Sequence, residues 1–198
     1  MKNISRIDHI SIAVRDPEKA KDFFVRILGG IPGAEADDES LGFNWKILSL
    51  GDLTRVEIIS PRGEKSFLEG FLKNRDGGVH HITLETPDIK ETRSLLEREG
   101  IPYFGYAEYP GGWWKELFIH PKDAFGVLIQ IAQFDPDSML GTEARVKTGK
   151  QWEITESGSS VSLTMRHPGG GKTEYTLSKD EISILIDDLK KMQQMPDS

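Results

Sequence analysis

Residues 7–14 (IDHISIAV) and residues 79–85 (VHHITLE) are the two stretches that decide the fold of this chain. Both are rich in β-branched residues, which predicts a strand that is buried on at least one face. An aspartate that can cap a helix follows each stretch, Asp16 in the first case and Asp88 in the second. The order of strand and helix therefore returns after 72 residues.

Each of these two strands is followed by the same series of predicted elements. In the first repeat, residues 6–61, a helix, a short strand, a polar loop and two strands are expected at or near residues 18–28, 31–34, 34–41, 43–50 and 54–60. In the second repeat, residues 78–134, a helix, a short strand and two strands are expected at or near residues 88–99, 102–104, 113–120 and 127–133. Such a long period predicts a duplicated α+β module with pseudo-twofold symmetry rather than a solenoid.

The duplication also predicts a polar cluster. The 72-residue shift places His81 on His9, while Glu57 follows His9 by 48 residues and Gln130 follows His81 by 49. A twofold axis brings equivalent inward-facing positions together, so these four side chains should converge. Two imidazoles, one carboxylate and one amide oxygen suit a divalent metal that keeps open positions for water or substrate. The alternation of side chains along a strand assigns His80 to the opposite face.

The composition limits the chemistry that this chain can perform. None of its 198 residues is cysteine, which excludes disulfides, thiolate nucleophiles and iron–sulfur clusters. Any metal must therefore be held by histidine, carboxylate, amide or water. The formal net charge of −7, with 25 basic and 32 acidic residues, argues against binding to nucleic acid. Neither a signal peptide nor a stretch of about 20 apolar residues is evident, so we expect a cytoplasmic protein without membrane association.

The last part of the chain, residues 141–198, differs in composition and predicts a small appendage. A polar linker is expected at residues 138–149, followed by a β-hairpin around residues 156–159 and a third strand at 172–177. Ser178 and Glu181 form a capping box in front of an amphipathic helix. A segment of this size supports only a marginal core, so we expect the helix to pack on the main module or on a partner subunit.

Four ordered motifs carry a resemblance to a known family: IDHISIAVRDPEKA at 7–20, RVEIISP at 55–61, VHHITLETPDIKE at 79–91 and GG-x5-FIHPKDAFGVLIQ at 111–130. Residues 6–134 resemble the vicinal oxygen chelate superfamily of glyoxalases, bleomycin-resistance proteins and dioxygenases. Within it, they are most similar to methylmalonyl-CoA epimerases and glyoxalase I-like proteins. The resemblance implies two βαβββ repeats that form a half-open barrel around one divalent metal ion, such as zinc, nickel, cobalt, manganese or iron.

By motif, the four metal positions of the family fall on His9, Glu57, His81 and Gln130. Typical epimerases and glyoxalases carry a glutamate at the last of these positions, and the epimerase has a further glutamate on the strand equivalent to residues 43–50. Here the former is Gln130, a carboxamide that cannot act as a general base, and the latter strand has no glutamate. We therefore expect Glu57 to be both a ligand and the catalytic proton carrier.

The leading hypothesis is a metal-dependent lyase or isomerase that moves a proton next to a carbonyl through a metal-bound enolate. Two alternatives stay open. Two histidines and a carboxylate also form the facial triad of non-haem Fe(II) ring-cleaving dioxygenases. A metal-free small-molecule binding protein, as in bleomycin resistance, is the second alternative.

The substrate is expected to be a small-molecule carbonyl compound or thioester. Trp113, Trp114 and Phe43, together with Tyr109, are candidates for the wall of a substrate pocket, although aromatic residues also serve simply as core. Lys122 is a candidate contact for a substrate anion. We also consider a homodimer.

Overall fold

The computed structural model describes residues 3–51, 54–63, 65–141, 150, 152–158, 160–166 and 172–195. The chain divides into two compact units, Met1–Arg145 and Val146–Ser198. Residues 142–149 of the predicted linker, and the predicted turn at 167–171, lie outside the described residues.

The first unit repeats one series of elements. The first copy comprises β1 (Arg6–Val14), α1 (Pro17–Asp22), β2 (Ile31–Asp38), β3 (Phe43–Leu50) and β4 (Thr54–Pro61). The second comprises β5 (Gly77–Glu85), α3 (Ile89–Arg98), β6 (Phe104–Glu108), β7 (Trp114–Ile119) and β8 (Ile129–Phe134). The short helix α2 (Leu68–Leu72) lies between the copies. The predicted capping residues, Asp16 and Asp88, accept hydrogen bonds from backbone amides at the start of α1 and α3.

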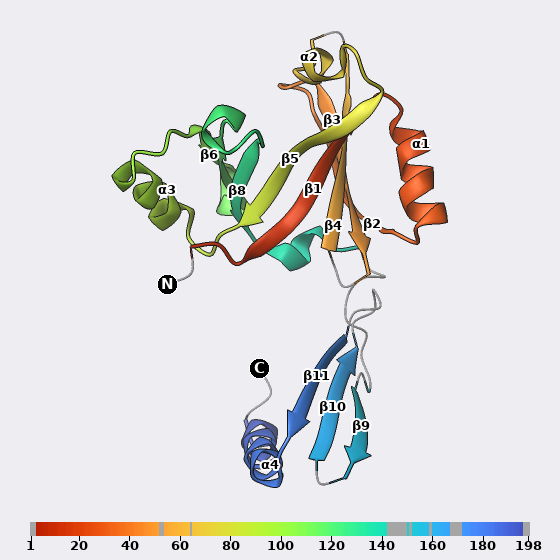
Figure 1. Ribbon diagram of the computed structural model, residues 1–198, viewed down its shortest axis with the longest axis vertical. Coiled ribbons are helices and arrows are strands. Elements are labelled where there is room, and N and C mark those ends of the chain that lie inside the picture. Colours follow the sequence, from red (N-terminus) through yellow and green to blue (C-terminus); the bar gives the residue numbers. More distant parts are fainter. Residues whose placement is uncertain are drawn as a thin grey trace. The chain divides into compact units, whose positions relative to one another are not determined.

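All eight strands of this unit form one curled sheet in the order β2-β3-β4-β1-β5-β8-β7-β6 (Figure 1). The order is a mirror image about its centre, where β1 and β5 pair antiparallel. Each of these central strands pairs parallel with the last strand of its own repeat, β4 or β8. The predicted class, an α+β fold of two βαβββ repeats in a half-open barrel, is confirmed.

Each repeat packs its own apolar cluster against the sheet. In the first, Leu68 and Leu72 of α2 pack with Ala13 and Ile59. In the second, Ile89 at the start of α3 packs with Leu117 and Ile131. Burial of a leucine or isoleucine side chain stabilises a fold by roughly 1.5–3 kcal/mol. The two clusters therefore hold α2 and α3 on the sheet.

Three elements of the repeats differ from the prediction. The strand expected near 102–104 forms instead at Phe104–Glu108, as β6. The strand β2 continues to Asp38, so the polar loop expected from residue 34 is wrong as far as residue 38. Polar residues are tolerated there because β2 is an edge strand, and Glu35 Oε2 lies 2.9 Å from Lys46 Nζ of β3. The helix predicted at 18–28 ends its regular part at Asp22 and continues as one π-helical segment, Phe23–Ile27.

The second unit contains β9 (Trp152–Ser157), β10 (Ser160–Arg166), β11 (Lys172–Leu177) and α4 (Lys179–Gln193). The three strands form an antiparallel sheet with β10 in the middle. The predicted capping box is present, since Ser178 and Glu181 exchange hydrogen bonds between side chain and backbone. None of the helices in the described ranges has the length and apolar character that crossing a membrane would need.

Candidate metal centre

The pairing of β1 with β5 brings the two predicted histidines to the centre of the sheet. His9 lies opposite Thr83, and Ser11 lies opposite His81. This arrangement is symmetric, because a shift of 72 residues converts each pair into the other. Both imidazoles are nearly excluded from solvent, with 3% of His9 and 7% of His81 exposed.

The outer neighbours of these strands supply the other two predicted ligands. Ser11 lies beside Glu57 in β4, and Thr83 lies beside Gln130 in β8. The predicted equivalence of Glu57 and Gln130 is therefore visible in the strand register. The duplication thus places two residues of the central strands, β1 and β5, and two residues of their outer neighbours, β4 and β8, around one point.

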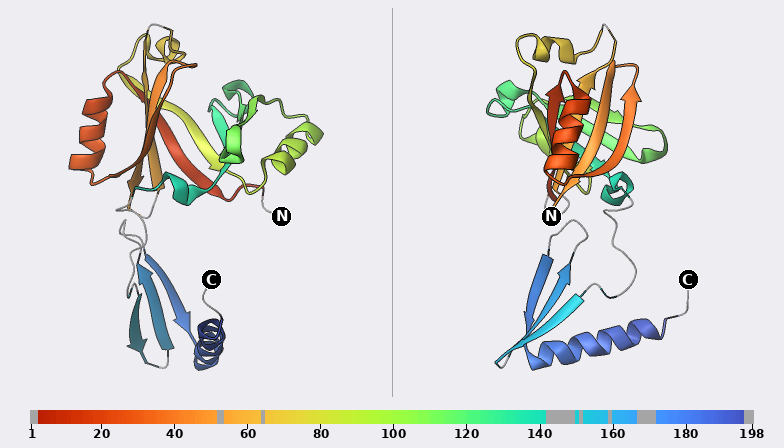
Figure 2. Two further views of the ribbon diagram at one scale, coloured as in Figure 1. Left: turned by 180° about the vertical axis from the view of Figure 1, so that it is seen from behind. Right: turned by 90° about the vertical axis from the view of Figure 1, so that its right-hand side faces the viewer.

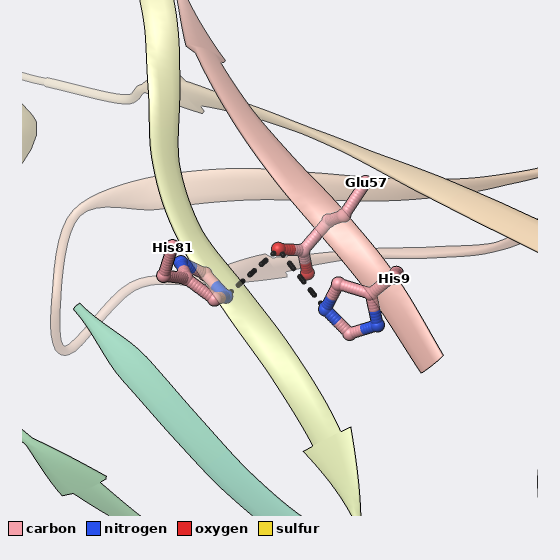
Figure 3. Close-up of side chains that lie close together, drawn as sticks. All are labelled: His9, Glu57 and His81. Atoms are coloured by element: carbon pink, nitrogen blue, oxygen red, sulfur yellow. Dashed lines mark ion pairs between the residues drawn. The ribbon is translucent and has the colours of Figure 1, made fainter. Parts of the chain in front are cut away.

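Three of the four predicted ligands offer atoms that converge. Glu57 Oε2 lies 3.7 Å from His9 Nε2 and 3.6 Å from His81 Nε2. One ligand atom of each residue lies within 4.8 Å of those of the other two. Figure 3 shows the Glu57 carboxylate between the two imidazole rings. Two imidazole nitrogens and one carboxylate oxygen at this spacing suit a divalent cation.

A buried ion pair, Asp8 with Arg55, lies beside the Nδ1 edge of His9. His9 Nδ1 lies 2.8 Å from Asp8 Oδ2, and Arg55 donates a 2.5 Å hydrogen bond to Asp8 Oδ1. Burial by itself raises the pKa of Asp8, but the His9 hydrogen bond and the Arg55 and Arg6 charges outweigh it and lower the pKa. When His9 is neutral, an ionised Asp8 accepts its Nδ1 proton, and the Nε2 lone pair is then free to face the cluster.

His81 is held in its neutral form. Burial, with the nearby His9 and His80 rings, places the pKa of His81 well below 6.5. Its Nε2 is buried and has no hydrogen-bond partner among the described residues. A buried nitrogen without a partner is costly unless something else occupies its lone pair. The site therefore fits a cation that His81 Nε2 would bind.

His80 does not lie on the face that strand alternation predicts. The register of β1 and β5 shifts between Ser11 and Ile12, whose partners are His81 and Val79. His80 is therefore the extra residue of a β-bulge, which redirects a side chain. Its Nδ1 lies 2.9 Å from His81 Nδ1, and its ring lines the central cavity.

Glu57 is a carboxylate in an environment that disfavours its charge. Its side chain is 13% exposed. Burial raises the pKa of Glu57, the charge of His9 partly opposes this effect, and the charges of Glu116 and Asp8 add to it. A buried carboxylate is stabilised by a bound cation or by a proton. Glu57 can therefore serve as a ligand or carry a proton.

Gln130 lies beside the three-residue cluster and connects it to a residue that the sequence analysis missed. Thr83 Oγ1 lies 2.8 Å from His9 Nε2 and donates a 2.5 Å hydrogen bond to Gln130 Oε1. Gln130 Nε2 in turn donates a 2.6 Å hydrogen bond to Glu116 Oε2. Glu116 was detectable in the sequence, because it alternates with two aromatic residues in the second-repeat strand equivalent to residues 43–50.

Glu116 accepts two further hydrogen bonds. Trp114 Nε1 donates to its Oε2 at 2.8 Å, and the Tyr109 hydroxyl donates to its Oε1 at 3.0 Å. Burial and the charge of Glu116 raise the pKa of Tyr109 to about 12, so this phenol stays a donor at neutral pH. Three donors directed at one acceptor match the hydrogen bonding of an ionised carboxylate.

These polar residues face a cavity of about 540 Å³. His9, Glu57, His81, Gln130 and Glu116 all line it. The predicted aromatic residues Phe43, Tyr109, Trp113 and Trp114 line it as well. A mostly apolar cavity with a few convergent polar groups is typical of small-molecule sites. Lys122 is not among the lining residues; it is exposed, and its Nζ lies 3.7 Å from Asp123 Oδ2.

Comparison with known proteins agrees with this architecture. Residues 8–118 match the family described as the Glyoxalase/Bleomycin resistance protein/Dioxygenase superfamily. An ethylmalonyl-CoA/methylmalonyl-CoA epimerase from Cereibacter sphaeroides is 38% identical over 133 residues, which are 66% of this chain and 98% of that protein.

Solved structures of methylmalonyl-CoA epimerases have a similar fold. The methylmalonyl-CoA epimerase of Mycobacterium tuberculosis superposes with a TM-score of 0.62 and 26% identity, over 69% of this chain and 93% of that one. A variant of the Streptomyces coelicolor methylmalonyl-CoA epimerase, in complex with 2-nitronate-propionyl-CoA, gives a TM-score of 0.60 and 25% identity, over 66% of this chain and 95% of that one.

Proposed function

This chain belongs to the glyoxalase/bleomycin resistance protein/dioxygenase superfamily, and from that premise we propose that it is a metal-dependent epimerase of a methylmalonyl-CoA-type thioester. In this reaction a proton leaves the carbon next to the thioester carbonyl and a proton returns to the opposite face of that carbon. No other bond breaks, so no co-reactant is needed. The relatives named as epimerases, and the complex of one of them with a CoA thioester analogue, support this substrate class.

His9, Glu57 and His81 would hold the cation. Gln130 Oε1 would be a fourth metal ligand once this oxygen turns toward the site. The fit is supported by the unpartnered His81 nitrogen and by the buried carboxylate that lies between two imidazoles. When bound, a divalent cation supplies Lewis-acid polarisation of the substrate carbonyl, which makes the neighbouring carbon more acidic.

The observation that carries the proposal is a pair of carboxylates that face one cavity from opposite repeats. Glu57 comes from β4 and Glu116 from β7. Inversion at carbon requires one group that takes the proton and another that returns one from the other side. In the metal-free protein burial raises the pKa of Glu57, whereas Glu116 accepts hydrogen bonds from three neighbouring side chains. Such unequal environments suit an acid and a base.

The proposed pair mirrors the arrangement that the family resemblance implies. There, one glutamate lies on the last strand of the second repeat and another on the third strand of the first. In this chain Gln130 stands at the first of these positions, and the strand that carries the second has no acidic residue. Glu57 and Glu116 instead occupy the equivalent strands of the other repeat. Pseudo-twofold symmetry makes the two arrangements similar in shape, so we propose that the acid–base pair has changed sides.

The aromatic side chains Phe43, Trp113 and Trp114 would form the apolar wall against which the acyl group packs. Lys122 remains a proposed contact for a substrate anion, and it would act at the surface because it does not line the cavity.

The metal content of purified protein tests the site directly. We expect Glu57→Ala and His81→Ala each to lose most of the divalent metal that elemental analysis finds in the wild type. Lys122→Ala is the matched control, because Lys122 is exposed and outside the cavity, and it should retain the metal. Wild-type metal content in both ligand variants would rule out this cluster as the site.

A further inference from the structure

The second unit has an apolar sheet face that the described residues of that unit leave uncovered. In the antiparallel sheet Ile154 lies opposite Leu163, which lies opposite Tyr175, so these three side chains share one face. The same face carries Trp152, Val161, Met165 and Leu177, together with the polar residues Glu156 and Thr173. The alternate residues, such as Thr155, Ser162 and Thr176, are polar and lie on the other face.

The helix α4 of the same unit has an apolar stripe. At helical spacing, one side is formed by Ile182, Leu185, Ile186, Leu189 and Met192. Four of these side chains are more than a third exposed, from 36% for Leu185 to 65% for Met192. The unit therefore presents two apolar surfaces, the sheet face and the α4 stripe.

Neither surface is buried within the unit. Trp152, Ile154, Met165 and Tyr175 are between 45% and 61% exposed. No apolar side chain is buried among the residues that the structure describes between 150 and 195. A unit of about 50 residues without a buried core is not expected to be stable alone.

The connection between β11 and α4 is one residue long. Only Ser178 separates Leu177, the last residue of β11, from Lys179, the first residue of α4. The capping box fixes the start of the helix at this residue. In Figure 2 (right) α4 leaves the end of β11 and crosses the direction of the strands instead of lying along the sheet face.

We propose that the sheet face of one copy of this chain binds the α4 stripe of a second copy, and that the exchange is reciprocal. A twofold axis would satisfy both surfaces of both copies at once, which is the geometry of an isologous interface. Eight large side chains, each at least a third exposed, offer on the order of 600 Å² per copy. Both copies together reach about 1,200 Å², the lower bound for a stable interface.

Cross-linking tests the contact, because the chain has no cysteine of its own. One full-length chain carries Ile154→Cys and one affinity tag, and a second carries Leu189→Cys and a different tag. After co-expression and treatment with a short bismaleimide, we expect a covalent product that contains both tags. Thr155→Cys is the matched control for Ile154→Cys, since its side chain lies on the polar face, and it should give at least tenfold less product.

Two results would overturn the proposal. One is no mixed-tag product above the Thr155→Cys control. The other is a link within one chain in an Ile154→Cys/Leu189→Cys double variant whose yield is independent of dilution, which would show that α4 covers its own sheet. Met165→Cys with Leu185→Cys provides a second pair if either first variant does not fold.

Discussion

Asp8 controls the orientation of His9 and neutralises Arg55, and both side chains of this ion pair are almost fully buried. We predict that Asp8→Asn lowers the affinity for divalent metal by about 10–100-fold, because the proton on His9 Nδ1 loses its acceptor charge. The same change removes the Asp8 charge from beside the buried Arg55 guanidinium, so the free energy of unfolding should fall by about 3 kcal/mol. Titration calorimetry and thermal unfolding measure the two effects.

Glu85→Gln is the control for this prediction. Glu85 pairs with the partly exposed Arg6 at the margin of the same network. Exposed pairs contribute less than about 1 kcal/mol, so the Glu85 variant should keep both its metal affinity and its stability. Wild-type metal affinity in Asp8→Asn would show that Asp8 does not support His9.

His81 makes the free energy of unfolding of the metal-free protein depend on pH, and the direction of this dependence follows from its pKa. Its folded-state pKa lies well below 6.5, the ordinary value, because of burial and the neighbouring imidazoles. Below about pH 6.5, His81 therefore binds a proton in the unfolded chain but not in the folded protein. The stability that its neutral form contributes is complete above about pH 6.5, and it is lost as the pH falls below that value. Glu57 acts in the opposite direction, since its pKa is raised.

The comparison of wild type with His81→Gln isolates this effect. Between pH 7.5 and 5.5, chemical denaturation of metal-free protein should show that the wild type loses more stability than the variant, by up to about 1.4 kcal/mol per pH unit below 6.5. Parallel curves for the two proteins would contradict the neutral His81.

At the scale of elements, the edge strand β2 makes a close backbone contact with the segment that follows β8. A Cβ atom at Gly33 would collide with the carbonyl oxygen of Met139, and one at Gly141 with the carbonyl oxygen of Pro32. Met139 is buried and lines the cavity. The two glycines thus allow this segment to close one side of the site.

Gly33→Ala should therefore destabilise the protein by about 1–3 kcal/mol, because the contact is between backbone atoms that cannot rotate away. Gly70→Ala is the control. Gly70 lies in α2 with free space around it, and the substitution should be neutral or stabilising by up to about 1 kcal/mol. Thermal unfolding measures both, and equal melting temperatures for Gly33→Ala and wild type would refute the close contact.

The elements also show what the sequence could predict. Strand and helix order followed from the repeat, because alternation and capping residues are local signals. The bulge at His80 and the length of β2 were missed, since both depend on pairing with a neighbouring strand. Glu116 was missed for a different reason, because the family resemblance places the second glutamate on the first-repeat strand, residues 43–50.

For the whole molecule, internal symmetry is what made a site of distant residues predictable. His9, Glu57, His81 and Gln130 span 122 positions, and the matching offsets were enough to bring them to one cavity. The sequence contained no comparable signal for the partner that the exposed apolar surfaces of the second unit would bind. Such a contact is set by the shape of two faces, and no motif encodes it.

Exchange of a substrate proton tests the central claim most directly. Metal-loaded protein in D₂O should incorporate one deuteron at the carbon next to the thioester carbonyl of methylmalonyl-CoA, as followed by NMR. A chelator should abolish epimerisation, and Glu57→Gln and Glu116→Gln should each slow it by about 10²–10⁴-fold. No exchange in the metal-loaded wild type, or wild-type epimerisation rates in both variants, would contradict the account.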